Sequence, residues 1–285
     1  MTKVKRQLMH IMFIAICFIS IMYFSKTSAS AAPAGSTATS VKVNGRQVLA
    51  GDVFNYRGDT YVPLFRFSAW LGKFQYSYDY KTKTARIDGE NLAILATEGK
   101  LYIEANGRYF YTSGEIMLDS GEMYVPIRPI VKALNSYIYY DDKAGQYVVS
   151  SGDSRLLKSG NQFYREDEVL WLARIIHAEA QGEPIKGKIA VGNVILNRVR
   201  SSQFPNTIYS VIFDKKYGVQ FTPSVNGAIY NTPNAESVIA AKICLEGYSI
   251  SNDILYFVNP KLAPNSWASK NRPYAFTIQN HSFFS

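Results

Sequence analysis

The stretch HAEAQGEPIKGKIAVGNVILNRV, residues 177–199, predicts the end of one helix, a break and the start of another. Gly182 and Pro184 mark the break, because glycine readily ends a helix and proline fits the first turn of the next one. Upstream, VLWLARIIHAEA at 169–180 repeats apolar residues at helical spacing on at least two faces. Downstream, PIKGKIAVGNVILNRVRS at 184–201 does so along one side. Two buried helices are therefore expected here.

The residues that follow predict a functional loop and a third helix. Residues 201–231 are rich in Gly, Pro, Asn and Phe, which is typical of a long irregular loop that carries function on a rigid scaffold. Thr232 and Pro233 predict the start of a helix that ends near Leu245, before Gly247. The alternating segments DILYFVNPK and RPYAFTIQNHSFF predict short strands or extended segments.

The first 31 residues have the pattern of a secretory signal peptide. Lys3, Lys5 and Arg6 precede the apolar run IMFIAICFISIMYF, and the small-residue stretch SKTSASAA follows it. Cleavage is expected after Ala31, and an uncleaved N-terminal anchor is the alternative. Without these residues, 27 basic side chains face 22 acidic ones. This mild excess suits an exported protein in an anionic cell wall, and no basic cluster interleaved with aromatics predicts nucleic-acid binding.

A repeat occupies residues 41–150, after a flexible lead-in at 32–40. The segment GDTYVPLFRFSAWLG at 58–72 matches GEMYVPIRPIVKALN at 121–135, and VNGR at 43–46 matches ANGR at 105–108. Each unit predicts a strand, a turn, a strand that ends in Tyr-Val-Pro, an amphipathic helix and a strand pair. A linker is expected at 151–164.

The repeat resembles the copper amine oxidase N-terminal-like domain, a small α+β module of exported bacterial proteins. The segment contains no histidine, so no copper site is expected. Its many tyrosines are suited to stacking on sugar rings, but tyrosine on alternating strand positions is more often sheet packing. A wall polymer or a protein is the expected partner of this module.

The side chains of the second half leave a carboxylate as the best candidate for chemistry. Zinc hydrolysis needs about three protein ligands, yet His177 and His281 are the two histidines after the signal peptide, and no HExxH motif occurs. Cys244 sits within an apolar helix and reads as a core residue, and no G-x-S-x-G elbow appears. Glu179 lies among apolar residues, which would raise its pKa toward that of a general acid. A solvated or salt-bridged helix residue is the plain alternative. Glu183 is expected to be turned away by Gly182.

Five blocks of the second half resemble the spore cortex-lytic, or cell wall hydrolase, family in order and spacing. They are HAEAQGEPIKGKIAVGNVILNRV, QFPNTIYSVIF, VQFTPSVNGAI, LYFVNP and NHSFF. Over residues 165–285 the resemblance implies a lysozyme-like, mainly helical domain that cleaves peptidoglycan glycan strands between N-acetylmuramic acid and N-acetylglucosamine. It also implies that Glu179 is the catalytic acid of a lytic transglycosylase, which forms 1,6-anhydro ends with one carboxyl and no cofactor or metal.

Substrate contacts are expected from the loop 219–229 and the C-terminal segments. Gln220 and Asn226 would bond acetamido or hydroxyl groups, and Phe221 offers a ring face. The further candidates for the cleft are Tyr256, Asn259 and His281. For each of these six residues, packing in the core or in a loop is an equal alternative. Thr222 stands where the family leads us to expect serine.

The expected protein is thus an exported α+β chain, a tandem-repeat module followed by a helical glycan-cleaving domain, acting as a monomer in the cell wall or spore cortex. The repeat replaces the peptidoglycan-binding helical domain often joined to cortex-lytic enzymes, which leaves vegetative wall remodelling and a role in spore germination equally open. Two other functions remain: a non-catalytic wall-binding protein, and a two-carboxylate muramidase that uses Asp214, Glu236 or Asp253.

Overall fold

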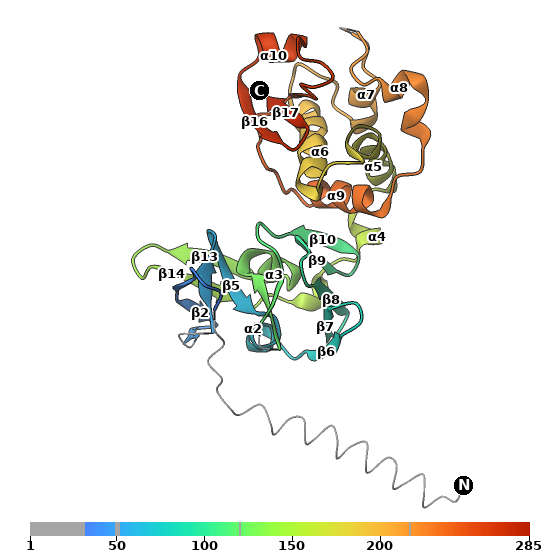
Figure 1. Cartoon of the computed structure of the whole chain (residues 1–285). Helices are drawn as coiled ribbons and strands as arrows, with labels where there is room; N and C mark the ends of the chain where they lie inside the picture. The colour runs from blue at the N-terminus through green and yellow to red at the C-terminus, as the bar shows by residue number, and fades with distance from the viewer. Residues whose placement is uncertain (1–31, 49–51, 120, 217) are drawn as a thin grey trace, which may run out of the picture.

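The computed structural model describes residues 32–48, 52–119, 121–216 and 218–285, and it has the predicted α+β class (Figure 1). Strands dominate up to residue 150, and helices dominate after it. The two parts lie against each other, with the short helix α4 (Gly160–Phe163) between them. The signal peptide expected at 1–31 lies outside the described residues. Within those residues, no helix has the length and apolar character to cross a membrane.

Three sheets form the strand-rich part. Their strand orders are β1-β4-β5-β12-β11, β10-β9-β8-β7-β6 and β13-β14-β2-β3. The strands are β1 (Thr37–Ala38), β2 (Val41–Val43), β3 (Arg46–Gln47), β4 (Phe54–Tyr56), β5 (Asp59–Pro63), β6 (Gln75–Asp79), β7 (Thr84–Gly89), β8 (Leu92–Thr97), β9 (Tyr102–Ala105), β10 (Arg108–Tyr111), β11 (Met117–Asp119), β12 (Glu122–Pro126), β13 (Tyr137–Asp141) and β14 (Gln146–Ser150). Helices α2 (Leu64–Leu71) and α3 (Ile127–Ala133) pack against them.

The two Tyr-Val-Pro segments lie side by side in the first sheet. Strand β5 pairs antiparallel with β12, so that Val62 faces Val125. Each strand ends at its proline, and the helices α2 and α3 begin at the next residue. Proline lacks the N–H that would continue the ladder, and its fixed φ suits a helix start. The predicted strand-to-helix transition is therefore present in both units.

The two Asn-Gly pairs form hairpin turns of the same geometry. Asn44 and Gly45 join β2 to β3, and Asn106 and Gly107 join β9 to β10. All four residues have positive φ, between 49° and 80°. Two successive positive φ angles define the mirror-image turn whose twist matches that of the flanking strands, and Asn-Gly adopts it at low cost.

Tyrosine in this part serves both packing and surface. Tyr61 and Tyr124 are buried and pack against Phe54, the first stacked on its ring and the second tilted to it. Tyr137 and Tyr139 stand exposed on β13. Sheet packing therefore explains part of the tyrosine content, and a sugar-stacking role remains a prediction for the exposed rings.

The helical part is built on three mutually packed helices. They are α5 (Glu166–Ala180), α6 (Ile185–Arg200) and α9 (Ala235–Leu245). The predicted break between the first two helices is confirmed, with Pro184 as the residue that precedes α6. The start predicted for the third helix is wrong by two residues: the side chain of Asn234 accepts from Ser237 N at 2.8 Å and caps α9. Asn is as good a cap as Thr, and the chain geometry selects between them.

The segment expected to be an irregular loop contains short helices. They are α7 (Ile208–Ile212), α8 (Pro223–Asn226) and the 3-10 turn η3 (Ala228–Tyr230). Thr207 caps α7 and Pro223 opens α8, and such local signals are too short to predict a helix against a Gly- and Asn-rich background. Helix α10 (Trp267–Asn271) was likewise not predicted. The predicted C-terminal strands are confirmed as β15 (Tyr256–Val258), β16 (Tyr274–Ile278) and β17 (His281–Phe284), in the order β15-β17-β16.

Gly192 lets α6 approach its two neighbours closely. A Cβ at this position would lie 2.7 Å from Cys244 Sγ and 3.0 Å from Ile176 Cδ1. Cys244 is buried in α9, as predicted, and burial raises the pKa of its thiol. The three-helix packing therefore depends on the missing side chain.

We expect Gly192→Ala to lower the free energy of unfolding by about 1–3 kcal/mol, because overpacking outweighs the gain in helix propensity. Urea unfolding followed by circular dichroism measures this. Gly182→Ala is the matched control, since its Cβ meets nothing within 4 Å. Equal stability of the two variants would contradict close packing at Gly192.

Candidate functional site

A cavity of about 720 Å³ lies beside the end of α5. Three segments that are far apart in the sequence wall it: the α5–α6 break, the 219–222 loop, and the C-terminal region around β15 and β17. Its lining residues are Ala178, Glu179, Ala180, Gly182, Glu183, Arg198, Val219, Gln220, Phe221, Thr222, Tyr256, Phe257, Val258, Asn259, Leu262, Ala263, Ala268 and His281. The fold thus brings four of the five sequence blocks of the second half to one hollow, and the block QFPNTIYSVIF contributes no lining residue.

Glu179 is a carboxyl group in the wall of this cavity, on the last turn of α5. The residues around it on the helix, Ile175, Ile176 and Ala180, are buried. Burial raises the pKa of Glu179 to about 7. The charged form loses hydration there and gains no compensating partner. A carboxyl with this pKa is protonated in a useful fraction near neutral pH and can donate a proton.

Arg198, on α6, connects three walls of the cavity. Its Nε donates to Leu255 O at 2.7 Å, and its Nη1 donates to Gln220 Oε1 at 3.3 Å. The guanidinium also lies over the rings of Phe221 and Tyr256, at 5.1 and 5.3 Å from their centroids. Burial lowers its pKa to about 10, although Tyr256 and Asp214 oppose the shift. Arg198 therefore positions Gln220, Phe221 and Tyr256 relative to one another.

Glu183 is a second carboxyl of the cavity wall, contrary to the expectation that Gly182 turns it away. The chain between α5 and α6 is short, so residues on both sides of the break face the same hollow. Glu183 is buried and accepts from Asn280 Nδ2 at 2.9 Å and from Asn280 N at 3.4 Å. This contact holds the β16–β17 turn against the break. His281 follows directly, and burial lowers the pKa of its imidazole, which Glu183 partly offsets.

Six of the seven residues predicted for the site line this cavity: Glu179, Gln220, Phe221, Tyr256, Asn259 and His281. Asn226 does not line it. It is the last residue of α8, and its side chain accepts from Ala228 N at 3.0 Å, which is a turn contact. The polar groups of Tyr256 and Asn259 are also engaged, with Arg272 Nη2 donating to Tyr256 Oη and Asn259 Oδ1 accepting from Lys261 N, both at 3.0 Å.

Sequence reasoning missed Arg198 and Glu183 as residues of this hollow. Arg198 lies in a helix whose pattern predicted only burial, and a long cation is rarely fully buried without a carboxylate partner. The sequence feature that could have indicated Arg198 is its position among apolar residues on the side of α6 that is buried. Glu183 was visible as an acid four residues after Glu179, but the direction of a side chain across a helix break follows from tertiary contacts.

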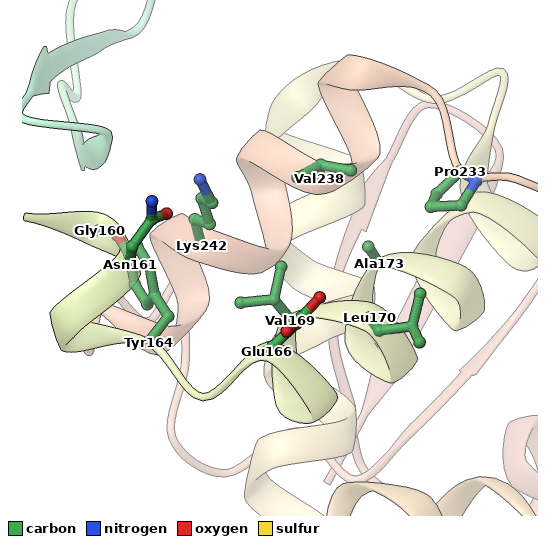
Figure 2. A pocket seen from close by; sticks show the side chains of 10 residues that line it. All are labelled: Gly160, Asn161, Tyr164, Glu166, Val169, Leu170, Ala173, Pro233, Val238 and Lys242. Atoms are coloured by element: carbon green, nitrogen blue, oxygen red, sulfur yellow. The ribbon is translucent and has the colours of Figure 1, made fainter.

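A second hollow, of about 470 Å³, lies between α4, the first turns of α5, and α9. Figure 2 shows the apolar residues Val169, Leu170 and Ala173 on α5 and Val238 on α9, with Glu166 beside Val169 and Lys242 on α9 toward Asn161 and Tyr164. It shares no lining residue with the cavity of Glu179. Among the described residues, no group of three His, Cys, Asp or Glu side chains is placed to hold a metal ion.

The chain belongs to the cell wall hydrolase family. The family model described as Cell Wall Hydrolase matches residues 182–284, and the one described as Copper amine oxidase N-terminal domain matches residues 42–149. The cell wall hydrolase CwlJ of Oceanobacillus iheyensis is 31% identical over 111 residues, which cover 36% of this chain and 77% of that protein. The match to the first model begins three residues after Glu179.

Spore cortex-lytic enzymes are also similar to this chain. The enzyme of Bacillus cereus is 37% identical over 120 residues, 42% of this chain and 45% of that enzyme. The enzyme of Bacillus subtilis is 35% identical over 120 residues, 42% of this chain and 38% of that enzyme. The solved catalytic domain of the germination-specific lytic transglycosylase SleB from Bacillus anthracis is 36% identical, covers 43% of this chain and 97% of its own length, and has a TM-score of 0.39. The chain therefore spans less than half the length of these spore cortex-lytic enzymes.

Proposed function

We propose that this protein cleaves the glycan strands of peptidoglycan between N-acetylmuramic acid and N-acetylglucosamine, with Glu179 as general acid. The observation that carries the proposal is a carboxyl group whose pKa is raised to about 7 by burial, in the wall of a cavity of about 720 Å³. A cavity of this size accommodates sugar rings. Membership of the cell wall hydrolase family supports the substrate class.

The proposed reaction is that of a lytic transglycosylase. Protonated Glu179 donates its proton to the glycosidic oxygen as the bond to C1 of muramic acid breaks. The carboxylate that results then removes the proton from the C6 hydroxyl of the same sugar, and this oxygen bonds to C1. The products are a new N-acetylglucosamine end with a free hydroxyl and a 1,6-anhydro end, so one carboxyl is sufficient and returns to its protonated state.

The proposed substrate contacts come from the three walls of the cavity. Gln220 and Asn259 hydrogen-bond acetamido and hydroxyl groups of the sugars, and Tyr256 offers a ring face; the support is that all three line the cavity. The ring face predicted for Phe221 is not offered, because this residue is buried, with the Arg198 guanidinium over its ring and Phe257 stacked beside it. His281 contributes a neutral imidazole, because burial lowers its pKa. Asn226 stays a predicted contact, although the cavity does not include it. Contact through α8 would require an extended substrate that reaches beyond the hollow.

A second candidate function is hydrolysis with two carboxylates, and one observation favours it. Glu183 lies in the same cavity wall as Glu179 and is buried. Hydrolytic glycosidases use such a pair, one as acid and the other as base or nucleophile. Asp214, Glu236 and Asp253, the partners considered from sequence, do not line the cavity. The third candidate, a non-catalytic wall-binding protein, would use the same hollow only to hold glycan.

Digestion of purified peptidoglycan tests these three functions together. The soluble products are separated and weighed by mass spectrometry, with and without prior borohydride reduction. We expect anhydro ends, which are one water lighter than reducing ends and resist reduction. Reducing ends would overturn the lyase in favour of the two-carboxylate hydrolase, and no new ends on either cortex or vegetative peptidoglycan would leave the binding protein.

We further propose a domain organisation for the chain in which an export signal directs the enzyme out of the cell. Residues 1–31 are the export signal, 32–40 a lead-in, 41–150 a module formed by duplication of one α+β unit, 151–164 a linker, and 165–285 a lysozyme-like domain. The matching Tyr-Val-Pro and Asn-Gly geometries of the two units support the duplication. Family membership supports action in the cell wall or spore cortex. The exposed Tyr137 and Tyr139 support binding of a wall polymer by the module.

A further inference from the structure

A single carboxylate joins the strand-rich module to the helical part. Glu246 follows the last residue of α9, and 2% of its side chain is exposed. Arg108, at the start of β10, donates from Nε to Oε1 at 2.7 Å and from Nη2 to Oε2 at 2.8 Å. The Arg108 side chain is itself 10% exposed. These residues are 138 positions apart in the sequence, so the contact is entirely a product of docking.

Two further donors converge on the same residue. Tyr164 Oη, from the chain segment after α4, donates to Glu246 Oε1 at 2.7 Å. Lys132 Nζ, on α3, donates to Glu246 O at 2.7 Å and lies 3.7 Å from Oε2. A carboxylate at a helix C-terminus is disfavoured by the helix dipole, so it is stable there only with cations nearby. The module supplies both of those cations.

Apolar packing continues the contact beyond the charges. Tyr111 of β10 is buried in the hydrophobic core of the helical part and lies 4.4 Å from the ring of Tyr248, centroid to centroid. Tyr102 and Tyr109 of the same hairpin also pack on that core. The strand β10 therefore serves as part of the wall of the helical region.

The segment expected to be a linker is built into the same contact. Gly160 N donates to Asn106 O at 2.8 Å, and a Cβ on Gly160 would lie 2.5 Å from Gly107 O. Phe163 stacks on the Arg108 guanidinium at 3.6 Å. A segment with these contacts has one position relative to both parts and cannot act as a free tether.

We propose that the β9–β10 hairpin and α9 form a permanent intramolecular interface, so that the module and the helical part unfold as one cooperative unit. Separation would expose the Tyr109 and Tyr111 rings and would leave Glu246 at a helix end without its cations. The part of the module that fits the α9 surface is the β9–β10 hairpin, which carries the cation Arg108 directly after its Asn-Gly turn. Any polymer bound by the module is then held at a fixed distance from the cavity of Glu179. This inference does not depend on the proposed reaction.

The repeat itself offers a matched control. Arg46 occupies the position of Arg108 in the first unit, after the corresponding Asn-Gly turn, but it is exposed. We expect Arg108→Met in the full chain to lower Tm by on the order of 10 °C, because the buried Glu246 carboxylate loses its bidentate partner and keeps Lys132, 3.7 Å away, as its remaining cation. Arg46→Met should change Tm by less than about 2 °C. Calorimetry of both variants and of the wild type measures this.

A double variant separates loss of the ion pair from general damage. Arg108→Met combined with Glu246→Leu removes both charges, and we expect it to recover at least half of the loss in Tm caused by Arg108→Met alone. No recovery, or equal effects of Arg108→Met and Arg46→Met, would overturn the role of the pair. A wild type with two separate calorimetric transitions would overturn cooperative unfolding.

Cutting the connection tests permanence without relying on stability. A protease site inserted between Lys158 and Ser159 of the full chain allows cleavage after folding. We expect the two halves to co-elute from a size-exclusion column at micromolar concentration in the wild type, and to separate when Glu246→Gln is introduced. Separation of the wild-type halves would show that the interface is transient. None of these readouts involves glycan cleavage, so failure of the proposed reaction would leave them unaffected.

Discussion

The variant Glu179→Gln is expected to lose glycan cleavage by a factor of roughly 10² to 10⁴, the usual contribution of a general acid. Glutamine has nearly the same shape but no acidic proton, so the cavity stays intact while the reaction loses its acid. The measurement is the rate of release of soluble muropeptides from purified peptidoglycan. Binding of glycan fragments to the variant should remain within a few-fold of wild type.

Two matched variants show whether the loss belongs to Glu179. Glu168→Gln alters an acid in the first turn of the same helix, 40% exposed, and should leave the rate unchanged. Glu183→Gln tests the second carboxyl of the cavity: activity within tenfold of wild type supports a single acid, and a loss as large as that of Glu179→Gln supports the two-carboxylate hydrolase. A fully active Glu179→Gln would exclude this residue as the acid.

The second large effect is expected from pH. Because burial raises the pKa of Glu179 to about 7, the protonated and active form decreases above that pH. We expect kcat/KM to approach a tenfold fall for each pH unit above about 8, and to fall about 50-fold between pH 7, where half of the carboxyl is protonated, and pH 9. A rate that is constant or increases up to pH 9 would contradict a protonated Glu179 as the donor. A second, acidic limb would point to an ionised partner such as Glu183.

The raised pKa of Glu179 also affects stability, so the Glu179→Gln variant, which loses activity, should gain stability at high pH. A carboxyl whose pKa is higher in the folded than in the unfolded state favours folding at low pH, and this contribution is lost as pH rises from 4.5 to about 7. The full difference corresponds to about 3 kcal/mol. Glu179→Gln lacks the ionisable group, so it should melt at a higher temperature than wild type at pH 8 and at a similar temperature at pH 4.

Local patterns in the sequence predicted much of this structure. The helix ending at Ala180, the break at Gly182 and Pro184, and the helix that follows arise from periodicity and from backbone preferences of single residues. The two Asn-Gly turns and the two proline-ended strands follow in the same way. By contrast, short helices such as α7 and α10 owe their stability to surrounding contacts, and their sequences alone do not specify them.

The sequence by itself determined that Glu179 is an acid among apolar neighbours, since helical spacing places Ile175 and Ile176 on the turn before it. Only the tertiary structure decided what else faces it. Glu183 and Arg198 line the same cavity because a helix break, a loop and a C-terminal hairpin converge there. The docking of Arg108 on Glu246 has the same origin. Contacts between residues distant in the chain depend on the packing of whole elements, and no local pattern encodes them.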